Sequence, residues 1–138
     1  MRTEPKGWQH ADDWCSAHSP YLQRKELIAF QKERNIATLG YSPLHPVTKT
    51  DGPLDAMLSA LAKKYYVTPN EILLRWAIDQ DIAPITTSSK EQRLSDYLRA
   101  LAFSLTPKEI DDIAAAGSQK HFRYWYKDKI DENDRAKQ

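Results

Sequence analysis

Two short apolar runs, at residues 36–41 and 82–87, constrain the fold of this chain more than any other feature. Both are too short for a helix, so they are predicted to be buried strands. Helical patterns precede, separate and follow them, and this alternation builds a parallel sheet with helices packed on its faces. Pro84 in the second run argues against a central strand, although a parallel strand near a barrel end tolerates it.

Two strands are too few for a complete sheet. A (β/α)8 barrel takes about 250 residues, so a chain of 138 residues supplies only a segment of one. We therefore expect an α/β fold that forms part of an incomplete barrel.

Five amphipathic helices are predicted around the strands, because apolar residues recur at three- and four-residue spacing. Three of them open with a capping box, in which a Ser or Thr and a Glu three residues later satisfy free backbone donors. One of these helices should bury a stripe made of Leu94, Tyr97, Leu98 and Leu101. The helices begin near Leu22, Leu54, Thr68, Ser88 and Thr106, and Asn35 and Gly117 end the first and the last.

Segments without periodicity set the expected limits of the folded part. Residues 42–53 are predicted to be a loop, and residues 1–17 are predicted to be irregular. We expect a non-matching N-terminal segment at 1–18, a folded domain at 19–120, and an aromatic loop with a charged tail at 121–138.

Charge and composition exclude several classes of partner. The 20 Lys and Arg residues balance 19 Asp and Glu, so no long-range field draws the chain to nucleic acid or to an anionic membrane. No apolar run approaches the roughly 20 residues of a membrane span, and the N-terminus lacks the apolar core of a signal peptide. A single cysteine, Cys15, fits a reducing compartment, and we expect a cytoplasmic protein.

The ends of the two predicted strands carry the polar groups that suggest a ligand site. The first strand ends in Tyr41-Ser42-Pro43-Leu44, and the second runs into Thr87-Ser88-Ser89 with Arg93 about one helical turn later. In barrels of this type phosphate binds after the last strands, at the start of a helix. On spacing alone, Ser88 could equally be a plain helix cap and Arg93 a solvated charge.

Five motifs occur in the order in which a known family has them: Ser19-Pro20-Tyr21-Leu22, Tyr41-Ser42-Pro43-Leu44, Leu73-Leu74-Arg75-Trp76-Ala77, Ser88-Ser89-Lys90-Glu91-Gln92-Arg93 and Leu105-Thr106. With them the chain resembles the aldo-keto reductases, in particular the fungal keto-amide and keto-ester reductases. The resemblance implies the C-terminal segment of a (β/α)8 barrel, a nicotinamide cofactor, and reduction of small aldehydes or ketones. NADPH is the implied cofactor.

The resemblance also implies a role for each site residue. Tyr41 would stack on the nicotinamide ring, and Ser42 and Leu44 would lie along the pyrophosphate. The 2′-phosphate of the adenosine would be held by Ser88, Ser89 and Arg93.

The sequence departs from the family at two neighbouring positions. Thr87 stands where most members have a lysine, which should weaken the grip on phosphate. Asp96 fits the position near the adenine, whereas Tyr97 replaces a common asparagine.

The larger departure lies before Ser19. The family's catalytic Asp, Tyr, Lys and His come from earlier strands, and nothing upstream matches them, so no catalytic residue is assigned. The family's Asn-Gln strand is also expected to be missing, because its positions are occupied by Trp14-Cys15-Ser16-Ala17. The resemblance therefore implies a truncated reductase that is inactive alone, since hydride transfer needs a proton donor.

Other sites are less well supported by the sequence. His10, Cys15 and His18 do not have the spacing of a zinc site, and no metal is expected. A nucleophilic Cys15–His18 pair lacks an orienting group. The aromatic cluster that includes Trp125 is either packing or a lining of the substrate pocket.

Two further functions remain open. An incomplete barrel could be a non-catalytic interaction module that associates with itself or with a partner through open sheet edges. It could also be a residual NADPH binder.

Overall fold

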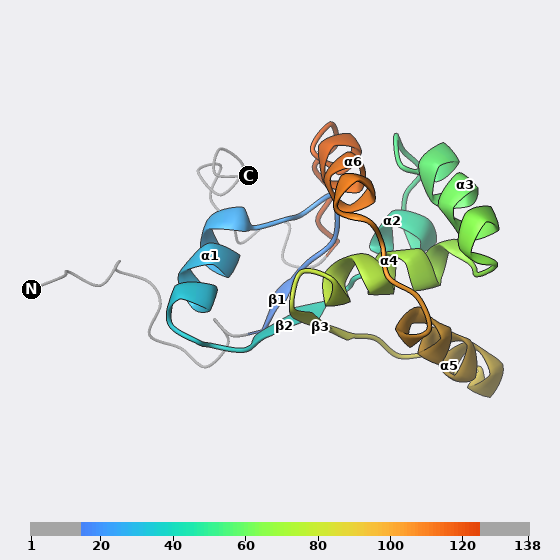
Figure 1. Ribbon diagram of the computed structural model, residues 1–138, viewed down its shortest axis with the longest axis horizontal. Coiled ribbons are helices and arrows are strands. Elements are labelled where there is room, and N and C mark those ends of the chain that lie inside the picture. The colour runs from blue at the N-terminus through green and yellow to red at the C-terminus, as the bar shows by residue number, and fades with distance from the viewer. Residues whose placement is uncertain (1–14, 125–138) are drawn as a thin grey trace, which may run out of the picture.

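The computed structural model describes residues 15–124, and its centre is a three-stranded parallel sheet (Figure 1). The strands are β1 (Cys15–Ala17), β2 (Thr38–Tyr41) and β3 (Ile82–Ile85), in the order β1-β2-β3. Both predicted strands are confirmed, although each is shorter than its apolar run. Within the described residues β3 pairs with β2 alone, and this edge position explains how it accommodates Pro84.

Strand β1 corrects two predictions. Residues 15–17 were expected to be irregular and the family's strand to be missing, yet these residues pair with β2 in parallel, with Cys15 opposite Leu39 and Ala17 opposite Tyr41. A three-residue strand is too short to show a period, and its pairing with a strand far along the chain is not a local signal. The strand that the family has at this place is therefore present, but its residues are Cys15-Ser16-Ala17 and not the family's Asn-Gln.

The predicted helices are present, with shifted ends. They are α1 (Lys25–Glu33), α3 (Asp55–Tyr65), α4 (Pro69–Ile78), α5 (Glu91–Tyr97) and α6 (Pro107–Gly117). A 3-10 helix, η2 (Leu98–Leu101), continues α5. Capping boxes open α4 at Thr68 and α6 at Thr106, as predicted. Within residues 15–124 no helix is long and apolar enough to cross a membrane.

Two predictions of local structure were wrong. The segment 42–53 contains a short helix, α2 (His45–Thr48). The capping box at Ser88 does not form, because α5 begins at Glu91 and the Oγ of Ser88 instead accepts a hydrogen bond from the backbone N–H of Lys90 at 3.1 Å. A hydroxyl that bonds two residues ahead competes with capping.

The stripe predicted on α5 and η2 is not buried. No residue of α5 is buried, and Leu94, Leu98 and Leu101 are 45%, 66% and 64% exposed. Only Tyr97 packs partly against the core, and Ala100 of η2 is buried. The periodicity predicted the helix correctly, but nothing within residues 15–124 covers these leucines.

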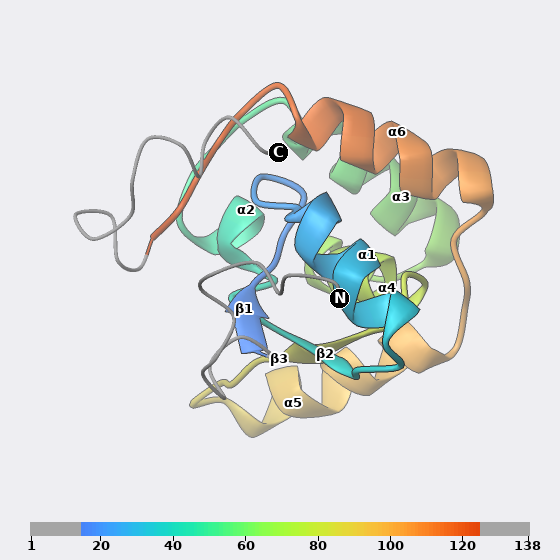
Figure 2. The same cartoon turned by 90° about the vertical axis from the view of Figure 1, so that its left-hand side faces the viewer.

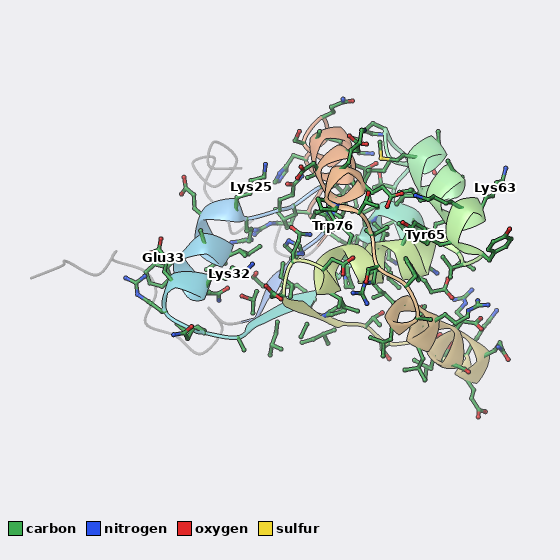
Figure 3. The ribbon with its side chains drawn as sticks, viewed as in Figure 1. Lys25, Lys32, Glu33, Lys63, Tyr65 and Trp76 are labelled. Atoms are coloured by element: carbon green, nitrogen blue, oxygen red, sulfur yellow. The ribbon has the colours of Figure 1, made fainter. Side chains whose placement is uncertain are left out.

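The core lies between α3, α4, α6 and one face of the sheet. Trp76 of α4 is 1% exposed, and its indole N–H donates to the carbonyl of Ile110 on α6 at 3.2 Å. Figures 1 and 2 show α1, α4 and α6 on the same side of the sheet, with α5 past the β3 edge, where α5 and η2 contact α4. Figure 3 shows Trp76 among the helices. The buried apolar cluster comprises Tyr21, Leu44, Leu54, Leu58, Ala62, Ile72, Leu73, Leu74, Trp76, Ala100, Leu105 and Ile113.

Gly117 ends α6 as predicted, but for a different reason. Its backbone is not left-handed, because no positive φ occurs there. A Cβ at this position would lie 2.2 Å from the carbonyl oxygen of Pro20. The missing side chain therefore lets α6 contact the loop after β1.

Candidate functional site

The three strands end at one edge of the sheet. Ala17, Tyr41 and Ile85 are in register at their last positions, so His18, Ser42 and Thr86 follow at the same edge. The backbone N–H of His18 donates to the carbonyl of Tyr41 at 3.0 Å. This hydrogen bond holds the residue that follows β1 against the end of β2. Ligands of parallel α/β sheets bind at this carboxyl edge.

The exit of β2 combines an accessible aromatic ring with a strained backbone. Tyr41 is partly exposed, and Ser42 has φ 60°, a left-handed conformation that is uncommon outside glycine. Strained residues of this kind cluster at ligand-binding sites. Leu44, in contrast, is buried in the core, and its carbonyl accepts hydrogen bonds from Val47 and Thr48. Its side chain and carbonyl are therefore occupied by the protein's own contacts.

The exit of β3 is open to solvent. Thr87, Ser89 and Arg93 are exposed, and Ser88 is partly buried. The Arg93 side chain forms no ion pair or hydrogen bond within residues 15–124. An unpaired guanidinium about one helical turn after two serines is suited to a phosphate group, to which arginine binds through two parallel hydrogen bonds.

Asp96 lies one turn after Arg93 but is already engaged on its own helix. Its Oδ1 accepts a hydrogen bond from Gln92 at 2.9 Å and lies 3.5 Å from a guanidinium nitrogen of Arg99. An adenine that contacts Oδ1 of Asp96 would share this oxygen with Gln92 and Arg99.

A residue that the sequence analysis missed, His45, links the β2 exit to the C-terminal segment. Its ring makes edge contacts with Phe122 and Tyr124, at centroid distances of 6.3 and 5.2 Å. Burial, and then the nearby charge of Lys49, lowers the pKa of His45. The described part of the aromatic cluster thus packs beside the sheet edge, whereas Trp125 lies outside the described residues. No periodic signal marked His45, because it stands in a predicted loop.

His18 is buried at the exit of β1. It is 2% exposed, its ring stacks on Trp76 with centroids 5.0 Å apart, and neither ring nitrogen has a hydrogen-bond partner in the described structure. Burial lowers its pKa to about 4. Gly40 of β2 leaves room for this ring, because a Cβ there would lie 3.1 Å from that of His18.

The imidazole of His18 is therefore neutral and enclosed. Within residues 15–124 no group of three His, Cys, Asp or Glu side chains could hold a metal ion. His10 lies outside the described residues.

Residues 16–118 match the model of the Aldo/keto reductase family. The chain belongs to this family. Its relatives include an NAD/NADP-dependent indole-3-acetaldehyde reductase from Schizosaccharomyces pombe, 35% identical over 78% of this chain and 38% of the relative. An NADPH-dependent alpha-keto amide reductase from Saccharomyces cerevisiae is also 35% identical, over 79% of this chain and 38% of its own length. The resemblance inferred from the motifs is confirmed.

Solved structures confirm the fold. An aldo-keto reductase from Bombyx mori, crystallised with NADP, matches with a TM-score of 0.69 at 30% identity, over 73% of this chain and 35% of that one. A Brucella melitensis aldo/keto reductase matches with a TM-score of 0.65 at 26% identity, over 74% and 38%. The fold is the C-terminal segment of a (β/α)8 barrel, and the chain spans little more than a third of its relatives' length.

Proposed function

We propose that this chain carries the nicotinamide-nucleotide-binding part of an NADP(H)-dependent reductase of aldehydes and ketones. The observation that carries the proposal is the unpaired, exposed Arg93 beside Ser88 and Ser89, at the same sheet edge as the accessible ring of Tyr41. The names of the relatives support it, because those enzymes are described as NADPH- or NAD(P)H-dependent reductases.

The residues at this edge fit such a cofactor. Arg93 and Ser89 would bind the 2′-phosphate that distinguishes NADPH from NADH, and the ring of Tyr41 would pack on the nicotinamide. Bound NADPH supplies a hydride to a carbonyl carbon. The backbone at Ser42 and the N–H of Leu44 are the groups left to contact the pyrophosphate, since the Leu44 side chain lies in the core.

Three predicted contacts are weaker parts of this proposal. Ser88 Oγ already accepts a hydrogen bond from the backbone N–H of Lys90, so only its hydroxyl hydrogen is left to contact a phosphate. Thr87 has a neutral hydroxyl where a lysine would add a charge, and Asp96 is engaged by Gln92 and Arg99.

We further propose that this chain is a truncated reductase that is inactive alone. Reduction of a carbonyl needs a proton donor aimed at the developing alkoxide. The family's Asp, Tyr, Lys and His have no counterpart before Ser19, and the chain spans 38% of the relatives named above. Reduction of an aldehyde or ketone by the purified chain with NADPH would refute this part.

The cofactor proposal is tested by titrating wild type and Arg93→Ala with NADPH and with NADH. We expect the substitution to weaken NADPH binding at least tenfold and to leave NADH binding nearly unchanged, because only NADPH carries the 2′-phosphate. Arg34→Ala is the matched control, since Arg34 ends α1 and stacks over the ring of Phe30 instead. Equal binding of both nucleotides by wild type would contradict the assignment of Arg93.

The remaining proposals follow from the same family fold. The cofactor-binding domain would extend over residues 19–120, flanked by the segments 1–18 and 121–138, and the protein would act in the cytoplasm. Trp125 would line the carbonyl pocket, because the adjacent Phe122 and Tyr124 already pack beside the sheet edge at His45. Replacing Trp125 in a full-length relative should change substrate preference.

A second candidate function is a non-catalytic interaction module. The exposed side chains of Leu94, Leu98 and Leu101 on α5 and η2 favour it, because monomeric soluble proteins seldom expose a contiguous apolar surface. Such a module would associate with another copy or with a partner through its open sheet edges. A strictly monomeric chain that binds no partner would contradict it.

A further inference from the structure

An ion pair ties the end of the helix that carries Asp96 to α4. Both α5 and η2, the 3-10 helix that continues it, contact α4 (Figure 1). The guanidinium of Arg99 on η2 reaches the carboxylate of Glu71 on α4. Its Nε donates to Oε1 at 3.0 Å, and its Nη2 lies 2.9 Å from the same oxygen. Arg99 therefore links the two helices through its side chain.

Glu71 is a fixed partner for this guanidinium. It is 0% exposed, and its other carboxylate oxygen, Oε2, accepts hydrogen bonds from the backbone N–H of Thr68 at 2.5 Å and from the hydroxyl of Thr68. Removing the partner of a buried carboxylate is strongly destabilising, so the pair with Arg99 is maintained. The start of α4 thus determines where the guanidinium of Arg99 lies.

The same guanidinium also reaches Asp96. Nη2 of Arg99 lies 3.5 Å from Oδ1 of Asp96, and this oxygen accepts a hydrogen bond from Gln92 at 2.9 Å. Within residues 15–124 the second oxygen, Oδ2, forms no hydrogen bond or ion pair, and the side chain of Asp96 is 31% exposed. The carboxylate is therefore held through one oxygen, which leaves the other free for a ligand.

The backbone of η2 is held to α4 by separate contacts. Ala100 is 1% exposed, and its carbonyl accepts a hydrogen bond from Arg75 of α4 at 3.2 Å. The backbone N–H of Leu105 donates to Asp79, at the end of α4, at 2.8 Å. Because these contacts do not involve the side chain of Arg99, that side chain can be changed without releasing the segment.

We propose that Arg99, fixed by Glu71, is a positioning residue that orients the carboxylate of Asp96 toward the amino group of an adenine. The inference rests on the proposed function, in which Asp96 is a predicted contact of NADPH. A carboxylate accepts a hydrogen bond from the 6-amino group of adenine but repels the 6-carbonyl oxygen of hypoxanthine. Arg99 would therefore affect the choice of base without touching the nucleotide.

The test titrates the purified chain with NADPH and with its hypoxanthine analogue, in which a carbonyl oxygen replaces the 6-amino group, and follows nucleotide fluorescence. We expect wild type to bind NADPH about tenfold more tightly than the analogue, because only adenine donates to a charged acceptor. The double variant Glu71→Gln, Arg99→Met should lower this preference at least threefold. Both changes are made together because Arg99→Met alone would leave the buried carboxylate of Glu71 unpaired.

Glu109→Gln is the matched control. Glu109 is the third residue of α6 in the same kind of capping box, and it pairs with Lys64. Glutamine is also accepted at this position of the box, so Glu71→Gln and Glu109→Gln both keep the cap and lose one charge. The control should show the wild-type preference for adenine, even where it is less stable. Circular dichroism checks that each variant is folded.

The outcomes separate this inference from the proposed function. A preference for adenine that the double variant retains would overturn the positioning role of Arg99 and leave the proposed function standing. Equal binding of the two nucleotides by wild type, or an equal loss of preference in Glu109→Gln, would have the same meaning. If wild type binds neither nucleotide, the proposed function fails and the positioning role fails with it.

Discussion

Within residues 15–124 the helical side of the sheet is covered by packed helices, whereas the carboxyl edge and the opposite face of the sheet are exposed. On the helical side Trp76, Ile72 and Ile113 are 1% exposed or less. At the sheet edge Arg93 is exposed, and α5 buries no residue. Within residues 15–124 the chain therefore buries its helical core but leaves the carboxyl edge of its sheet and the leucines of α5 and η2 exposed.

The largest effect expected from this contrast comes from Trp76. Trp76→Ala removes a fully buried ring, its stacking on His18 and its hydrogen bond to Ile110, and should cost about 3–5 kcal/mol of unfolding free energy. Leu98→Ala, at an exposed position of η2, should change the unfolding free energy by about 0.5 kcal/mol or less. Urea denaturation measures both, and comparable losses would break the comparison.

His18 makes the helical side sensitive to acid. Because burial lowers its pKa to about 4 in the folded state, the unfolded chain binds more protons between this value and the ordinary 6.5. The contribution of the neutral His18 to the free energy of unfolding is therefore fully present above pH 6.5. It is lost as the pH drops toward 4, and the loss is about 3 kcal/mol at 1.36 kcal/mol per pKa unit.

Denaturation across this pH range checks the prediction. His18→Phe should keep the stacking and remove most of the dependence, with a smaller remainder from His45, whose pKa burial also lowers. His121→Gln is the control at an exposed histidine. An unchanged pH dependence in His18→Phe would refute the assignment.

A smaller effect is expected where α6 is tied to α3. Glu109 accepts hydrogen bonds from Tyr65 at 2.6 Å and from the backbone of Thr106 at 2.8 Å, and pairs with Lys64. Burial raises the pKa of Glu109, but hydrogen bonds from Lys64, Tyr65 and Thr106 outweigh it and lower the pKa to about 2. Figure 3 shows Tyr65 between the helices.

Glu109→Ala should therefore cost about 1–2 kcal/mol, through the lost cap and hydrogen bonds. Asp112→Ala, which breaks the exposed pair with Lys108 on the same helix, should cost less when thermal unfolding is compared. Equal losses would mean that the cap and the hydrogen bonds of Glu109 stabilise the fold no more than an exposed ion pair does.

The smallest effect on stability is expected at the sheet edge. Ser42→Gly relieves a left-handed conformation but adds freedom to the unfolded chain, so the net change should stay within about 0.5 kcal/mol. NADPH binding should nevertheless weaken, because glycine no longer holds the backbone in the conformation that would contact the pyrophosphate. A large loss of stability with unchanged binding would make Ser42 a structural residue, against the proposed role.

The sequence predicted what depends on local periodicity and local capping. The helices of the core and the capping boxes at Thr68 and Thr106 follow from residues that lie within one or two turns of each other. The two apolar strands and the polar residues at their exits were also predictable, because parallel strands end at a common edge.

Features that depend on distant neighbours were not predictable. Strand β1 has three residues and exists through pairing with β2. The leucines of α5 have the spacing of a buried face, but burial needs a partner that no local pattern can reveal. The contacts of His45 with Phe122 and Tyr124 join positions far apart in the chain, so a loop histidine gave no signal.

The central claim, a cofactor-binding segment without its own chemistry, is tested most directly by following NADPH with the purified chain before and after a carbonyl compound is added. The account predicts a saturable change in NADPH fluorescence on binding, which needs at least tenfold more NADPH in Arg93→Ala, and no loss of absorbance at 340 nm once the aldehyde or ketone is present. Steady carbonyl-dependent oxidation of NADPH, or the absence of any binding by wild type, would contradict it.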